Sequence, residues 1–161
     1  MAGLKLHLDE FDEVDYDLIA IHSSLEDYRL AYFINQKLSV ALSKSKEEIG
    51  VKVKDGEASF EKFTYDDQYN AILWSLIPNK NQIAITRQSA RPDLFGNVSE
   101  QTAKVYLLPE LKKVDYFLKI ENNHHTLNLD EIVRNIKSIK RISTVYAVVP
   151  DNIKSKNNLI F

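Results

Sequence analysis

The stretch Val14-Asp15-Tyr16-Asp17-Leu18-Ile19-Ala20-Ile21-His22 decides the fold class together with the amphipathic segment that follows it. Its apolar run at 18–21 is typical of a central strand that is covered on both faces. Ser23 and Glu26 then have the spacing of a capping box, and apolar residues recur at helical spacing over about 25–37. The sequence therefore predicts a strand that leads directly into a helix.

Between residues 38 and 86 the hydrophobic period changes to that of strands. Residues 51–53 and 60–65 flank Asp55-Gly56, a pair that supplies the positive φ angles of a hairpin turn. Two further strands are predicted at 71–77 and 83–86, with a turn between them. These elements predict an antiparallel meander.

The second half of the chain repeats the order of strand, helix and strand. Strands are predicted at 105–108 and 114–120, Asn128 is an N-cap candidate for an amphipathic helix over 129–139, and 142–149 forms a last strand. We therefore predict a single α+β domain in which two helices pack on a mainly antiparallel sheet.

The second half also contains a segment that is similar in sequence to one in the first half. Val114-Asp115-Tyr116-Phe117-Leu118 shares four of its five residues with the segment at 14–18, and both segments lead toward a capped helix. The match suggests a pseudo-repeat of strand-helix-strand units joined by the meander, although one pair of segments does not establish a duplication.

Composition narrows the classes of function. The 161 residues carry a net charge of −2 and contain no cysteine, which excludes disulfides, thiolate metal sites and cysteine nucleophiles. We expect a cytoplasmic protein, because the amino terminus lacks a secretory signal and no segment has the length of an apolar membrane span. We expect neither a membrane partner nor a cofactor.

The segment Leu108-Pro109-Glu110-Leu111-Lys112-Lys113-Val114-Asp115-Tyr116 resembles the signature of the bacterial IPExxxVDY family of uncharacterised proteins. Pro109, Glu110, Val114, Asp115 and Tyr116 match this pattern, and Leu108 replaces its isoleucine. The resemblance extends to Asp15-Tyr16, Asp27-Tyr28, the residues at 74–80 and the ending at 154–161. It implies no activity and no catalytic residue.

The signature has a structural and a functional interpretation. Pro109 favours an extended Leu108 and a tight connection, in which Glu110 and Asp115 accept backbone hydrogen bonds while Tyr116 packs. The alternative is a pair of carboxylates in a cleft that serves acid/base chemistry in a small-ligand enzyme. We favour the structural interpretation.

Three other groups of residues are weaker candidates for a site. His124-His125 lacks the spacing of metal ligands, so an exposed loop is favoured and no metal is expected. Arg87 and Arg91 lie in a polar segment at 87–104 that is predicted to be a long loop, where solvated arginines are favoured over an anion site. The aromatic residues are predicted to be buried in the core or against a partner rather than to stack on RNA bases. They are Phe60, Phe63, Tyr65, Tyr69 and Trp74.

The carboxy-terminal part of the chain is basic, whereas the first thirty residues are acidic. Solvated faces explain most such charge runs, but a basic surface also suits RNA or an acidic partner. The candidate contacts are Arg134, Lys137, Lys140 and Arg141.

We therefore favour a non-enzymatic protein-interaction or accessory domain that binds itself or another protein, for example through a sheet edge, an aromatic face or the apolar tail at 159–161. RNA or ribonucleoprotein binding and a small-ligand enzyme that uses Glu110 and Asp115 are the alternatives.

Overall fold

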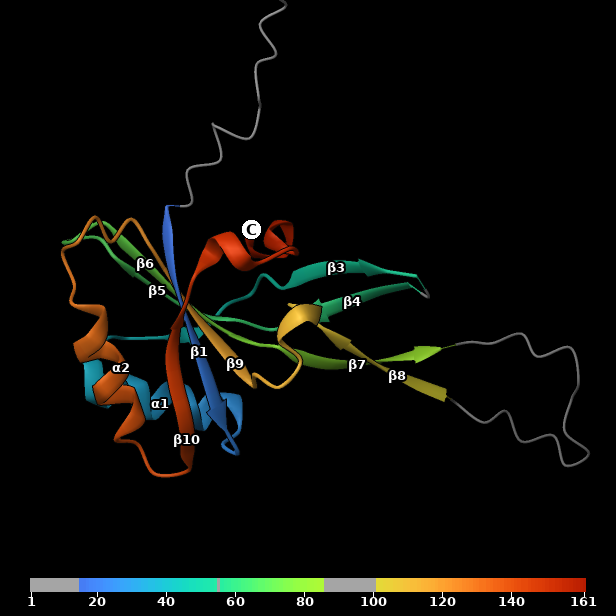
Figure 1. The fold of residues 1–161 in the computed structure, drawn as a ribbon, viewed down its shortest axis with the longest axis horizontal. Coiled ribbons are helices and arrows are strands. Elements are labelled where there is room, and N and C mark those ends of the chain that lie inside the picture. The colour runs from blue at the N-terminus through green and yellow to red at the C-terminus, as the bar shows by residue number, and fades with distance from the viewer. Residues whose placement is uncertain (1–14, 55, 86–100) are drawn as a thin grey trace, which may run out of the picture.

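The computed structural model describes residues 15–54, 56–85 and 101–161. Within them, a six-stranded sheet with the order β10-β1-β9-β6-β5-β2 forms the centre, and two-stranded ribbons β3-β4 and β7-β8 extend from it (Figure 1). The strands are β1 Tyr16–Ser23, β2 Ser43–Lys44, β3 Ile49–Val53, β4 Gly56–Phe60, β5 Phe63–Asp67, β6 Ile72–Pro78, β7 Lys80–Ile85, β8 Gln101–Tyr106, β9 Tyr116–Glu121 and β10 Ile142–Val148. The α-helices are α1 Asp27–Leu38 and α2 Leu129–Lys137.

The α+β prediction is confirmed, and the connectivity consists of two interleaved units. In the first unit, α1 links β1 to β6 through the inserted strands β2 to β5; in the second, α2 links β9 to β10. Every pairing within the central sheet is antiparallel, so the two strands of each unit are parallel with one antiparallel strand between them. This is the βαββαβ arrangement of ferredoxin-like folds, with insertions.

The strands that begin at Tyr16 and Tyr116 pair with each other. β1 and β9 are antiparallel neighbours, in which Tyr16 lies opposite Glu121 and Ile21 lies opposite Tyr116. The two tyrosines therefore lie at opposite ends of the central pair, as the two interleaved units require.

Both faces of the sheet are buried, as the apolar run in β1 predicts. Ile19 and Ile21 contribute to a core beneath α1 and α2, whereas Leu18 and Ala20 belong to a second core on the opposite face. The β3-β4 ribbon, the end of β8 and the carboxy-terminal segment cover that second face (Figure 1). The sheet therefore forms the middle of three layers.

Several boundaries differ from the predictions. β3 pairs with β4 at 56–60 rather than with residues 60–65, and β7 pairs with β8 instead of continuing the meander from β6. Residues 101–104, predicted to be loop, belong to β8, while 86–100 lie outside the described residues.

The two helices begin differently. Glu26 is the N-cap of α1 and no side chain caps this helix, because Ser23 belongs to β1 and its hydroxyl accepts from the Leu25 N–H instead. The N-cap prediction for Asn128 is confirmed, since its side chain accepts from the N–H groups of Asp130 and Glu131. No helix in the described part of the chain has the length and apolar character needed to cross a bilayer.

Candidate functional site

The signature segment surrounds Asn79, a buried residue between β6 and β7. The Asn79 amide nitrogen donates to the carbonyls of Leu111 and Val114, both at 2.9 Å, and its Oδ1 accepts from the Leu108 N–H at 2.9 Å. Its backbone also bonds to Asp115 and Leu107. One side chain therefore satisfies three backbone groups of the signature, through two buried hydrogen bonds and one part-buried one.

Asp115 joins the start of β9 to two other parts of the fold. Its carboxylate accepts from the Ser23 N–H at 2.9 Å and forms an ion pair with the Lys80 ammonium at 2.9 Å. The Asp115 N–H donates to the carbonyl of Ile21. The carboxylate therefore fixes the end of β1 against the start of β9.

Glu110 faces different partners. Its carboxylate accepts from the Ser155 N–H at 2.9 Å and from the Ser155 hydroxyl at 3.0 Å, which attaches the carboxy-terminal segment to the signature. Partial burial raises the pKa of Glu110, but hydrogen bonds from Ser155 and from the backbone of Glu110 and Lys154 together outweigh that effect, so the pKa lies below its usual value. The geometry thus gives Glu110 and Asp115 separate partners.

Tyr116 connects β9 to the start of α1, since its hydroxyl donates to the Leu25 carbonyl at 2.7 Å. Burial, followed by the nearby carboxylates of Asp27, Asp115 and Glu26, raises the pKa of Tyr116 to about 12. The phenol is therefore a neutral hydrogen-bond donor at physiological pH.

We expect this pKa shift to appear in the alkaline stability of the protein. Because the folded pKa is above the unfolded value of about 10, the contribution of Tyr116 is complete below pH 10 and is lost as the pH rises toward 12. Tyr116→Phe should lower the free energy of unfolding by about 1 kcal/mol at pH 8 and flatten its decline between about pH 10 and pH 12. Urea unfolding across this range measures both effects, and an unchanged alkaline decline would contradict the assignment.

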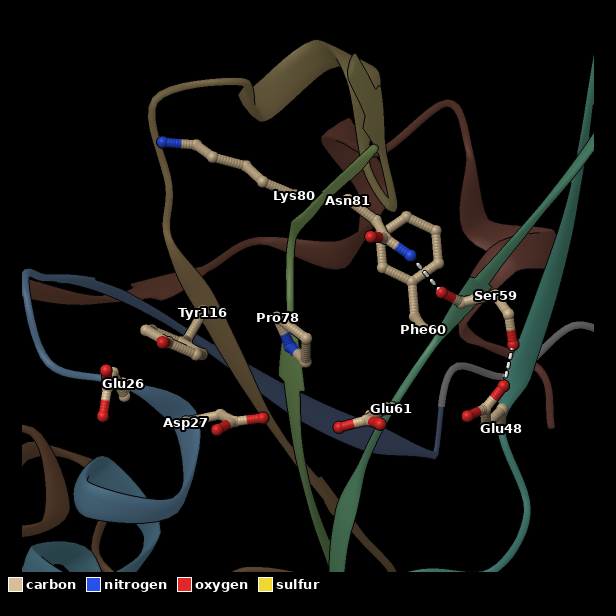
Figure 2. A pocket seen from close by; sticks show the side chains of 10 residues that line it. All are labelled: Glu26, Asp27, Glu48, Ser59, Phe60, Glu61, Pro78, Lys80, Asn81 and Tyr116. Atoms are coloured by element: carbon tan, nitrogen blue, oxygen red, sulfur yellow. Dashed lines mark hydrogen bonds between the residues drawn. The ribbon is translucent and has the colours of Figure 1, made fainter. Parts of the chain in front are cut away.

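A groove of 510 Å³ lies beside Tyr116, between the start of α1, β4 and β7 (Figure 2). Four carboxylates and one ammonium line it, and Figure 2 shows Asp27 and Glu61 on facing walls. Neither Glu110 nor Asp115 lines the groove. The excess of negative charge disfavours a phosphate or nucleic-acid ligand here. The charged residues are Glu26, Asp27, Glu48, Glu61 and Lys80.

A buried lysine that the sequence analysis missed lies on the face opposite the helices. Lys119 in β9 is 3% exposed; its ammonium donates to the Leu159 carbonyl at 2.6 Å and lies 3.1 Å from a carboxylate oxygen of Glu121. The ring of Phe161 lies over the same ammonium, at 4.3 Å. Lys119 therefore holds the carboxy-terminal segment against the sheet.

The histidine pair lies in an exposed turn after β9. His124 and His125 have positive φ angles, and His124 Nδ1 is 3.8 Å from a carboxylate oxygen of Asp15. Among the described residues, no group of three or more potential ligands is arranged to hold a metal ion. The pair thus lies where the loop interpretation places it.

The aromatic residues divide between core and surface. Phe60, Phe63 and Trp74 are buried, and Tyr65 packs against the core beneath the helices, as predicted. Tyr69 is 96% exposed in the turn between β5 and β6. The meander therefore presents no continuous aromatic face for RNA bases. Arg87 and Arg91 lie outside the described residues.

The two edges of the central sheet differ. β2 has two residues, one of them Lys44, which pairs with Glu61 at 2.9 Å. β10 has seven residues and carries no charge, glycine or proline, and among the described residues no strand pairs with its outer side. Tyr146 on this strand is 38% exposed, with its ring 5.8 Å from that of His22. β10 is therefore the open edge.

The four basic candidates are exposed and lie near this open edge. Arg134 and Lys137 belong to α2, which packs on β10, and Lys140 and Arg141 are in the turn between them. The structure thus gathers all four at one end of the second strand-helix-strand unit.

Comparisons with protein-family models, with curated proteins and with solved structures found no match to this chain. The similarity to the IPExxxVDY signature remains a resemblance.

Proposed function

We propose that this chain is a non-enzymatic protein-interaction domain, and that it binds its partner by strand addition at the outer side of β10. The open edge is the observation that carries the proposal. Folded proteins blunt such edges with charge, proline, bulges or short length, and β2 follows that rule. β10 has one irregularity, a register shift at its start, and is regular over residues 144–148.

The composition of β10 supports the same proposal. Its Ile-Ser-Thr-Val-Tyr-Ala-Val sequence combines high β-propensity with no charge, which is typical of segments that aggregate unless a partner covers them. Val149, directly after the strand, is 57% exposed and extends the apolar surface. Strand addition would satisfy the free backbone groups and bury these side chains together.

The catalytic alternative receives less support from the described residues. The carboxylates of Glu110 and Asp115 each have structural partners, and neither lines the groove beside Tyr116. RNA binding keeps a specific observation in its favour, namely the four exposed basic side chains near β10. The two binding proposals predict different responses to nuclease.

Affinity capture of the tagged full-length protein from its native cells, with and without nuclease, tests the proposal. Tyr146→Lys should abolish retention of a protein partner, because it places a charge on the edge. Tyr69→Lys is the matched control, since it changes another exposed tyrosine far from β10 in the sheet order, and it should bind like the wild type.

Loss of the captured material on nuclease treatment would favour RNA binding instead. A nuclease-resistant partner that Tyr146→Lys still retains would contradict the use of β10.

A further inference from the structure

We infer that the partner at β10 is a second copy of this chain, joined about a two-fold axis so that the two sheets become continuous and the two α2 helices lie side by side. This inference rests on the proposed function and names its partner. The evidence comes from α2, whose charged residues would lie opposite residues of the opposite charge on a second α2 that runs antiparallel to it.

The direction of α2 relative to β10 fixes how the helices meet. The helix links two parallel strands, so it runs antiparallel to β10, and its last turn lies near the start of that strand. When two β10 strands pair antiparallel, the start of one lies beside the end of the other. The last turn of one α2 therefore approaches the first turn of the second.

The face of α2 that turns toward the edge follows from helix geometry. Ile132 and Ile136 point into the core and α1 lies on one side of α2. With the right-handed crossover that such units adopt, positions 130, 133 and 137 lie on the opposite side, above the outer edge of β10. The three edge-side residues are thus Asp130 and Lys137, which are exposed, and Val133, which is half-buried.

These three positions are self-complementary. Asp130 and Lys137 are nearly equidistant from Val133, so in an antiparallel helix pair Asp130 of each copy faces Lys137 of the other. The arrangement yields two equivalent opposite-charge contacts with Val133 near the axis. A two-fold interface requires such matching, because the same patch must serve both sides.

Sedimentation velocity of the full-length protein over a range of concentrations tests the inference. The wild type should show a dimer mass that falls on dilution. Asp130→Lys and Lys137→Asp should each weaken dimerisation about tenfold, because each replaces two attractions by two like-charge contacts. An equimolar mixture of these two variants should regain the wild-type affinity, since each mixed contact again joins opposite charges.

Glu131→Lys provides the matched control for Asp130→Lys. It makes the same charge change in the same helical turn, but position 131 points away from the edge, so dimerisation should be unaffected. Recovery of affinity on mixing would show that the substitutions act at the interface. If they only damaged the helix, each chain would stay damaged in the mixture and the affinity would not recover.

Two outcomes would overturn the inference, and they bear differently on the proposed function. A wild type that stays monomeric at all concentrations, while Tyr146→Lys still removes a captured protein, means that β10 binds a different partner. A dimer that neither Asp130→Lys nor Tyr146→Lys weakens means that the interface lies elsewhere, which contradicts both proposals.

Discussion

Replacement of Asn79 by alanine should lower the free energy of unfolding by about 4 kcal/mol, because it removes the partner of three backbone groups at once. The Leu108 N–H and the carbonyls of Leu111 and Val114 would each lose a hydrogen bond; the bonds to Leu108 and Val114 are buried and the bond to Leu111 is part-buried. Leaving one such group unsatisfied costs about 1–3 kcal/mol. Urea denaturation measures the loss.

Asn79→Asp tests whether hydrogen bonding, rather than side-chain volume, carries this effect. Aspartate has nearly the same shape and can still accept from the Leu108 N–H, but its ionised form places charge against two carbonyl oxygens. These contacts raise the folded pKa of the new carboxyl group, so the variant should regain stability as the pH falls below about 5, where the group is protonated. If Asn79→Ala unfolds like the wild type, the proposed role of Asn79 is wrong.

The role of Asn79 could not be predicted from the sequence. The turn predicted at 78–81 is only a bend at Asn79, because Pro78 ends β6, Lys80 begins β7, and these two strands do not pair with each other. The bonds of Asn79 reach residues 29 to 35 positions away, and no periodicity or spacing encodes such contacts. The signature residues could be identified from sequence, but the residue around which they fold could not.

Elements with strong local patterns were predicted best. The apolar run in β1, the cap at Asn128 and the stripe of α2 follow from side-chain period and capping chemistry alone. Strand pairing was predicted less well, because it depends on contacts between distant segments. β6 pairs with β9 and not with β7, which follows it directly in the sequence. The open edge at β10 is a property of this pairing order and was therefore visible only in the structure.

Lys119 carried a signal that the sequence analysis did not use. It alternates with Leu118 and Ile120 in a predicted strand, so it lies on the other face from these two apolar residues. In the structure β9 lies between β1 and β6, and both faces of the sheet are covered. A buried lysine requires partners, and the nearest candidate in β9 on the same face is Glu121, two residues later.

Lys119→Ala should lower the free energy of unfolding by about 2–3 kcal/mol, because the partly buried Glu121 carboxylate loses its ion pair with a buried ammonium. Glu121 would lose its ion pair while its second carboxylate oxygen is already buried without a hydrogen bond. The Leu159 carbonyl would also lose its donor, so the carboxy-terminal segment should loosen. Urea denaturation gives the first quantity and amide hydrogen exchange at residues 153–161 gives the second.

The combination of Lys119→Met with Glu121→Gln separates charge from packing. It removes both charges and keeps most of the side-chain volume, so it should be more stable than Lys119→Ala; the Leu159 carbonyl still lacks its donor, which leaves a cost of about 1–3 kcal/mol relative to the wild type. Lys62→Met is the matched control: this lysine is 8% exposed and its ammonium also lies over Phe161, at 4.6 Å, so its loss should cost only about 1 kcal/mol. If Lys62→Met and Lys119→Ala destabilise the protein equally, contact with Phe161 rather than the pair with Glu121 holds the segment in place.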